Sequence, residues 1–190
     1  MFKKLLGIVL ALTIALGACS AVFAEKGGSS RWSSAKAKRE AKAEVGGLLD
    51  SLDYIAALLD DRHSLADIIV RIAAVYGEDI KNAEVMSALN KMEKGIGKSI
   101  EFMQNVQDRL ANDLTYSEKD YQNSMDTAAR SFLNVLDPKE IDETVEILYS
   151  LMQVKGVVEL SAIFSTIRYI YDLLKRTQAL SPDLAALAYA

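Results

Sequence analysis

The sequence predicts an all-α protein, an irregular multi-helix bundle of about six helices that follows a cleaved N-terminal signal. Proline occurs at only two positions, Pro138 and Pro182, and Ala, Leu, Ile, Lys and Glu are abundant, a composition that favours long helices over strands. From Val45 onward, apolar residues recur every three or four positions through most of the chain, which is the spacing of one helix face. No fixed-period repeat is visible, so we expect one globular bundle rather than a repeat array.

Residues 1–24 have the organisation of a secretory signal peptide. Lys3 and Lys4 give the segment a positive start, and residues 5–16 form an uncharged, mostly apolar run. This run is about a dozen residues long, shorter than the roughly 20 residues that a membrane-spanning helix requires. The sequence therefore predicts an exported, bacterial-type protein rather than one with a permanent transmembrane helix.

Two processing sites are compatible with this signal. Residues 16–19, Leu-Gly-Ala-Cys, resemble a bacterial lipobox, which implies cleavage before a lipidated Cys19 and a membrane-anchored lipoprotein. Residues 22–24, Val-Phe-Ala, resemble an ordinary small-x-small site, which implies cleavage after Ala24 and a periplasmic or secreted product. We favour the lipobox because Cys19 is the only cysteine in the chain and stands where the apolar run ends.

The cysteine count and the charge restrict the mature protein further. No cysteine follows Cys19, so the exported domain has no disulfide and depends on packing, or on a partner, for stability. The formal net charge of the whole chain is −4, and loss of Lys3 and Lys4 with the signal makes the product more acidic. An acidic domain is a poor candidate for binding nucleic acid through its phosphates, so we predict no nucleic-acid partner.

After the signal, the chain divides into a tether and one domain. Residues 25–34 are rich in Gly and Ser and predict a flexible tether, and residues 35–190 predict a single helical domain. The domain begins with a run of four cations, Lys36, Lys38, Arg39 and Lys42. In one interpretation they are the solvated start of a helix. If Cys19 carries a lipid, they are candidates for contact with an anionic membrane surface.

Six helices and a short terminal one account for the rest of the domain. The apolar spacing predicts helices over residues 35–59, 65–76, 85–114, 117–136, 138–152 and 157–176, followed by a short helix that Ser181 opens. On this spacing Leu114 and Met152 lie on inward-facing stripes. The apolar stretch over residues 157–174 is interrupted by charges such as Arg168, which predicts a core helix and not a membrane span.

Several residues are suited to begin or end these helices. Ser64 is a candidate N-cap for the second helix, and Gly77 is a candidate stop. Ser117, with Asp120 three residues later, is placed to open the fourth helix. Pro138 suits the first position of the fifth helix, where its missing N–H is not needed, and Gly156 separates the last two long helices.

The sequence lacks the residue patterns of common active sites. His63 is the only histidine and lies in a polar link between two helices. One histidine without cysteines cannot form the usual ligand set of a zinc site. A catalytic triad is also not indicated, because the chain has no Gly-x-Ser-x-Gly motif to supply the nucleophile. Lys98 and Ser99 follow a glycine, but the segment lacks the first glycine of a phosphate-binding loop and reads as helix. We predict no catalytic residue, no metal site and no cofactor, and therefore a protein that is not an enzyme.

Charged residues within the helices have simpler interpretations. Carboxylates share helix faces at three- or four-residue spacing, but no Glu-x-x-His element accompanies them, so they are expected to be solvated faces. These pairs are Asp50 with Asp53, Glu140 with Glu143, and Asp142 with Glu146. The guanidinium of Arg168 is expected to stay in water, and Glu159 is a candidate partner if this guanidinium is buried.

Three functional hypotheses follow. The first is a noncatalytic cell-envelope lipoprotein whose bundle binds an unknown envelope protein. The alternative is a periplasmic carrier that binds an apolar ligand or lipid within the bundle, suggested by a stripe of Met86, Met92 and Met103. The third is an enzyme that uses carboxylates or tyrosines without a standard motif. An enclosed apolar cavity would favour the carrier, and a filled core with an exposed apolar patch would favour partner binding.

Overall fold

The computed structural model describes residues 32–133, 138–154 and 156–179. Within these ranges the chain forms six helices and no strand, which confirms the predicted all-α class. The helices are α2 (Ala35–Leu59), α3 (Arg62–Val75), α4 (Asn82–Asn112), α5 (Glu118–Leu133), α6 (Pro138–Ser150) and α7 (Val157–Ala179). The predicted signal, most of the tether and the short helix from Ser181 lie outside the described residues.

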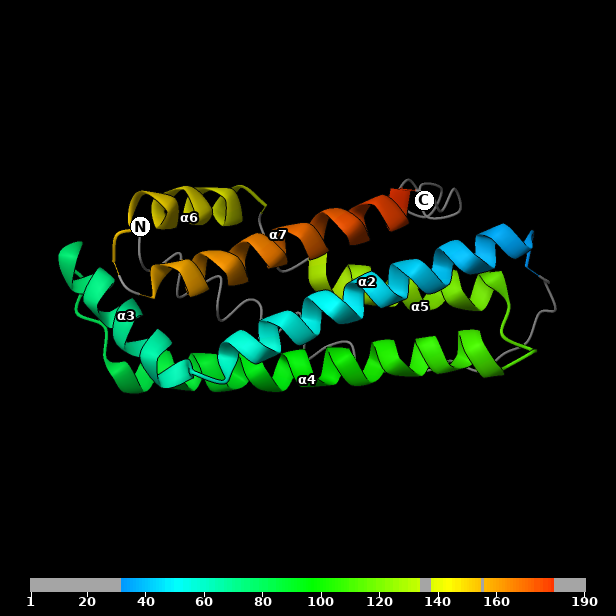
Figure 1. Cartoon of the computed structure of the whole chain (residues 1–190), viewed down its shortest axis with the longest axis horizontal. Helices are drawn as coiled ribbons and strands as arrows, with labels where there is room; N and C mark the ends of the chain where they lie inside the picture. The colour runs from blue at the N-terminus through cyan, green and yellow to red at the C-terminus, as the bar shows by residue number, and fades with distance from the viewer. Residues whose placement is uncertain (1–31, 134–137, 155, 180–190) are drawn as a thin grey trace, which may run out of the picture.

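The helices form an elongated bundle in which neighbours in space run in opposite directions (Figure 1). Helix α2 packs along α4, and α7 packs against α2, α5 and α6. Helix α3 links α2 to α4 and packs against the first part of α4. The start of α2 and the turn between α4 and α5 therefore lie at one end, and α3 and the start of α7 lie at the other (Figure 1).

The part of the chain between α4 and α7 is divided into two shorter helices, α5 and α6, and Pro138 explains where α6 begins. Proline has no backbone N–H and clashes with the preceding turn, so a helix cannot continue through it, but it fits well as a first residue. Pro138 is the first residue of α6, as predicted. Both α5 and α6 pack against the 23-residue α7, which thus spans the two shorter helices.

The core is built from the apolar faces that the spacing predicts. Along α2 the side chains of Val45, Leu48, Leu52, Ile55 and Leu59 are each 4% exposed or less. The stripe of α4 includes Met92 and Met103, which are buried among aliphatic neighbours, and Met86, which is partly buried against them. Burial of one such side chain is worth about 1.5–3 kcal/mol, so these stripes are the main source of stability.

Two helix boundaries follow the predicted chemistry. At α5, the Ser117 hydroxyl accepts from the Asp120 N–H at 3.2 Å, and the Ser117 N–H donates to the Asp120 carboxylate at 2.9 Å, which completes the capping box. After α3, Gly77 adopts a φ of +74° and its N–H donates to the Ala74 carbonyl at 3.0 Å. Gly77 therefore ends the helix as predicted, because glycine enters the left-handed region without steric cost.

Three predictions about side-chain placement are wrong. Helix α3 begins at Arg62, so Ser64 lies inside its first turn and does not cap it; the N-cap position belongs to Asp61. Leu114 is 97% exposed and Met152 is 38% exposed, although both continue the apolar spacing. The reason is that α4 ends at Asn112 and α6 at Ser150, and beyond a helix end the period no longer directs side chains inward.

The contact between Gly156 and Ile68 gives a test of the packing between α3 and the start of α7. Gly156 has a φ of +92°, and a Cβ built on it would lie 1.9 Å from Ile68 Cδ1. We expect Gly156→Ala to lower the free energy of unfolding by roughly 2–3 kcal/mol, measured by urea denaturation, because backbone strain and a steric clash add.

Gly77→Ala is the matched control, since Gly77 has a similar φ but open space around its Cβ position. Its expected loss is about 1 kcal/mol, from backbone strain alone. Ile68→Val removes the clashing methyl group, so Gly156→Ala should cost less in that background. Equal losses for the two glycine substitutions would contradict the proposed clash.

Candidate functional site

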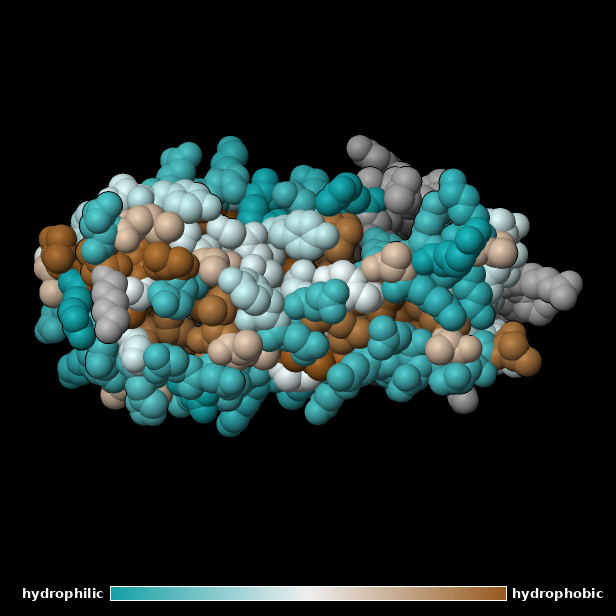
Figure 2. All heavy atoms as spheres, in the orientation of Figure 1, coloured by the Kyte–Doolittle hydropathy of each residue, from teal (hydrophilic) through white to brown (hydrophobic). Residues whose placement is uncertain are grey.

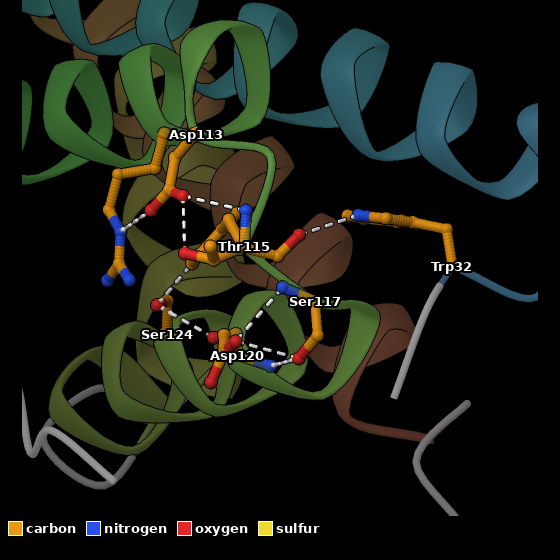
Figure 3. Close-up of polar contacts among 8 residues, drawn as sticks. Trp32, Asp113, Thr115, Ser117, Asp120 and Ser124 are labelled. Carbon is orange, nitrogen blue, oxygen red and sulfur yellow. Dashed lines mark hydrogen bonds and ion pairs between the residues drawn. The ribbon is translucent and has the colours of Figure 1, made fainter. Parts of the chain in front are cut away.

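The N-terminal segment is bound to the turn between α4 and α5. The Trp32 Nε1–H donates to the Tyr116 carbonyl at 2.9 Å (Figure 3). The Ser33 N–H donates to the Glu118 carboxylate at 2.7 Å. Ser34 then caps α2 by accepting from the Ala37 N–H at 3.0 Å. The described part of the predicted tether, residues 32–34, is thus attached to the domain at this end.

A buried tyrosine extends this attachment into the bundle. The Tyr121 ring lies 5.8 Å from that of Trp32, centroid to centroid, and its hydroxyl donates to the Glu44 carboxylate at 2.6 Å. Burial raises the pKa of the Tyr121 hydroxyl, and the bond to Glu44 raises it further. Tyr121 therefore stays protonated and remains a hydrogen-bond donor that joins α5 to α2.

The α4–α5 turn is fixed by its own side chains. Asp113 accepts from the Thr115 N–H at 2.8 Å, and the Arg109 Nε lies 3.6 Å from the same carboxylate (Figure 3). The Arg109 guanidinium also lies 4.3 Å from the ring centroid of Tyr116, whose hydroxyl donates to Ser124 at 3.0 Å. These contacts hold the backbone between the two helices in one conformation.

The predicted membrane-contact cations lie at this same end. Lys36, Arg39 and Lys42 are exposed on the first turns of α2, and Lys38 is half-buried. The Lys36 ammonium is 3.6 Å from the Glu40 carboxylate, an exposed pair of little energetic weight. The predicted lipidation site, Cys19, lies outside the described residues.

The remaining candidates for chemistry do not come together. His63 is exposed in the first turn of α3, and residues 32–133, 138–154 and 156–179 contain no group of three His, Cys, Asp or Glu placed to hold a metal. Asp50, Asp53 and Glu143 are exposed on helix faces.

Arg168 is partly exposed and pairs with carboxylates other than Glu159, the candidate partner that we named for the case in which it is buried. Its guanidinium lies 2.6 Å from Asp142 of α6 and 2.6 Å from Asp172 of α7, and not against Glu159. Asp172 is one helical turn away, and α6 brings Asp142 across from a different part of the chain. The ion pairs join α6 to α7, which gives this arginine a structural role.

Two hollows open on the surface of the described residues. One of about 310 Å³ lies between α3 and the start of α7, where Asp67, Arg71 and Glu159 surround Leu65 and Ile68. The other, of about 360 Å³, is a shallow groove between α2 and α7. Its lining combines two half-exposed tyrosines with a carboxylate and hydroxyls, namely Tyr54, Tyr169, Asp50, Ser51, Ser165 and Thr166.

Large apolar side chains are exposed at the end opposite to Trp32. They come from the end of α3, the end of α6, the turn between α6 and α7, and the start of α7. Each is between 38% and 79% exposed. We call them the distal patch: Val75, Tyr76, Tyr149, Met152, Val154 and Val158. Gly156, between Val154 and Val158, lies close to Ile68, so the start of α7 packs against α3. Hydrophobic surface is visible at this end of the molecule (Figure 2).

No family model, curated protein or solved structure matches this chain. None of the helices in the described ranges combines the length and the hydropathy of a membrane-spanning segment.

The capping box of α5 predicts a pH-dependent contribution to stability. Hydrogen bonds from the Ser117 hydroxyl and N–H hold the pKa of Asp120 below its ordinary value. A lowered folded-state pKa means that the contribution is present above the unfolded value of about 3.9 and is lost as the pH falls through the folded value. We expect Asp120→Asn to cost roughly 1 kcal/mol at pH 7, and the difference from wild type to vanish near pH ~2.

Urea denaturation followed by circular dichroism between pH 2 and 7 would measure this difference. Asp53→Asn, on an exposed face of α2, is the control and should change stability by less than about 0.5 kcal/mol. A loss for Asp120→Asn that stays constant over the whole pH range would contradict the assignment.

Proposed function

We propose that this chain is a noncatalytic exported lipoprotein of the cell envelope and that its helical bundle binds another protein. The observation that carries the proposal is the distal patch, a set of exposed apolar and tyrosine side chains on two neighbouring segments. Exposed apolar side chains gathered at one end of a folded domain are typical of an interaction site, and tyrosine is enriched where proteins meet.

The position of the distal patch supports this role. The predicted signal and tether precede Trp32, and Trp32 is bound at the opposite end of the bundle (Figure 1). An anchor that joins the domain there leaves the distal patch far from the point of attachment and open to a partner. Exposed carboxylates near the patch, such as those of Asp79 and Glu146, suit a partner with a basic rim around an apolar centre.

The core favours partner binding over the carrier alternative. Met92 and Met103, which suggested a ligand site, are buried in contact with the hydrophobic core and fill it. The two hollows described above are open and carry charged or hydroxyl groups, whereas a carrier of apolar molecules requires an enclosed apolar chamber. The Met stripe is accounted for as ordinary packing.

The anchoring part of the proposal is tested by the mass of the mature N-terminus in the native host. We expect a chain that begins at Cys19 and carries two or three acyl groups, since the lipobox-like residues stand directly before it. A chain that begins at Glu25 would retain export and refute the lipid anchor. A chain that still begins at Met1 would refute export itself.

The partner-binding part is tested by photocrosslinking in the intact envelope. A photoreactive phenylalanine analogue at Val154 should give one discrete adduct with another protein, and the same analogue at Leu114, at the opposite end, should not. Val158→Asp should reduce the adduct at position 154 at least ~10-fold, because a charge in the centre of an apolar contact costs more than 1.4 kcal/mol. Absence of an adduct at Val154, together with a lipid that copurifies with the protein, would favour the carrier.

A further inference from the structure

We infer that the end of the bundle where α2 begins faces the membrane and contacts anionic lipid head groups, with Leu114 at its tip entering the interface. The inference rests on the proposed export and deepens it, because it assigns an orientation to the anchored domain. The surface consists of exposed cations on three helices and one exposed leucine: Lys36, Arg39, Lys42, Lys119, Lys175, Arg176 and Leu114.

Leu114 is held out from the end of the bundle by a fixed turn. It is 97% exposed, while the next-but-one residue, Tyr116, is 1% exposed and fully anchored in the core. Asp113 and Thr115 on either side of Leu114 bond to each other, and Trp32 bonds to the Tyr116 carbonyl (Figure 3). A single exposed leucine is common on protein surfaces, so its meaning depends on what surrounds it.

The same end of the bundle carries the exposed cations, and four carboxylates near the α4–α5 turn accept hydrogen bonds within the protein. Glu44 accepts from Tyr121, Glu118 accepts from the Ser33 N–H, and Asp120 accepts from Ser117. Asp113 is bound by Thr115 and Arg109. The carboxylates of Glu44, Asp113, Glu118 and Asp120 therefore accept hydrogen bonds within the protein, whereas Glu40 and Asp108 are exposed, as are the lysines and arginines of α2, α5 and α7 that form this surface.

The opposite half of the molecule carries the acidic surface. Asp61, Asp67, Asp79, Glu146 and Glu159 are exposed on or near α3, α6 and the start of α7, where Arg71, Lys81 and Lys139 are exposed as well. Exposed carboxylates therefore outnumber exposed cations in this half of the bundle. A negative surface attracts one end and repels the other, within a screening length of about 10 Å. An anionic bilayer is the occupant that matches both the cations and the apolar tip.

The length of the N-terminal segment makes this contact attainable but does not by itself select an end. Cys19 precedes Trp32 by 13 residues, which reach at most about 45 Å when fully extended. The 31-residue α4 is about 46 Å long. A tether of this length holds the domain near the membrane, and the charge distribution and Leu114 select the face that meets it.

The test uses single thiols in the processed, full-length mature chain. Because Cys19 is the only cysteine and is either acylated or removed, Leu114→Cys and Val75→Cys each provide one reactive thiol at opposite ends. Both sites are highly exposed, so Val75 is a matched control. Each variant is labelled with an environment-sensitive fluorophore and reconstituted with vesicles of phosphatidylglycerol and phosphatidylcholine or of phosphatidylcholine alone.

We expect the label at position 114 to shift to the blue in phosphatidylglycerol vesicles and to be quenched by aqueous iodide roughly threefold less than in buffer. The label at position 75 should be quenched by iodide equally in phosphatidylglycerol vesicles and in buffer. Lys36→Glu, Arg39→Glu and Lys42→Glu together should abolish protection at position 114. The matched triple at the N-cap and in the first half of α4, Lys81→Glu, Lys91→Glu and Lys94→Glu, should leave this protection unchanged.

Equal quenching of the two labels in anionic vesicles overturns the inference. Protection of position 114 in buffer without vesicles also overturns it, because that protection would come from a second copy of the chain. These failures are separable from failure of the lipid anchor. An acylated Cys19 with equal quenching leaves the anchor intact and removes the orientation. A chain that begins at Glu25 and still protects position 114 keeps the lipid-facing end without the anchor.

Discussion

The rest of the structure depends on the burial of apolar helix faces. Helices α2 and α4 bury theirs against each other, and α7 buries its face against α5 and α6. No cysteine follows Cys19, so the domain has no covalent staple and must derive its stability from this contact. Burial is non-directional, and long antiparallel helices exploit it by aligning whole faces. The result is an elongated body whose two ends are far apart and free to differ.

The two ends do differ in chemistry. At the start of α2, a network that includes Trp32, Tyr121 and Glu44 satisfies polar groups with one another and fixes the backbone. At the other end, the turn before Gly156 packs closely on Ile68 and leaves valines and tyrosines of the distal patch in solvent. An exported protein that is tethered at one end and recognised at the other requires such a division, and the proposed functions of the two ends follow from it.

Local patterns in the sequence predict what local chemistry decides. The apolar period defines α4, the Ser117–Asp120 pair starts α5, and Pro138 and Gly156 set boundaries, because each of these effects acts within about one helical turn. The contacts that the sequence does not predict join residues far apart in the chain. The bond from Trp32 to Tyr116 spans 84 residues, and that from Arg168 to Asp142 spans 26. No spacing rule encodes such contacts, since they exist only after the helices have packed.

Leu114 marks the limit of the periodic argument at the candidate membrane-facing end. Its spacing from Leu110 suggests a core position, but α4 has already ended and the turn directs the side chain outward. The cations of α2 are visible in the sequence, whereas the internal use of the neighbouring carboxylates is not. The character of this surface therefore emerges from tertiary hydrogen bonds rather than from composition.

The attachment of Trp32 and Ser33 also has a mechanical consequence. A helix that begins at a free chain end unravels under tension from its first turn, one hydrogen bond at a time. Here the segment that leads to α2 is bound to residues 84 and 85 positions further along the chain. If the chain is anchored as proposed, tension on the N-terminal segment would be divided between α2 and the α4–α5 turn and would act along antiparallel helices in shear. Yielding would then require several contacts to break together.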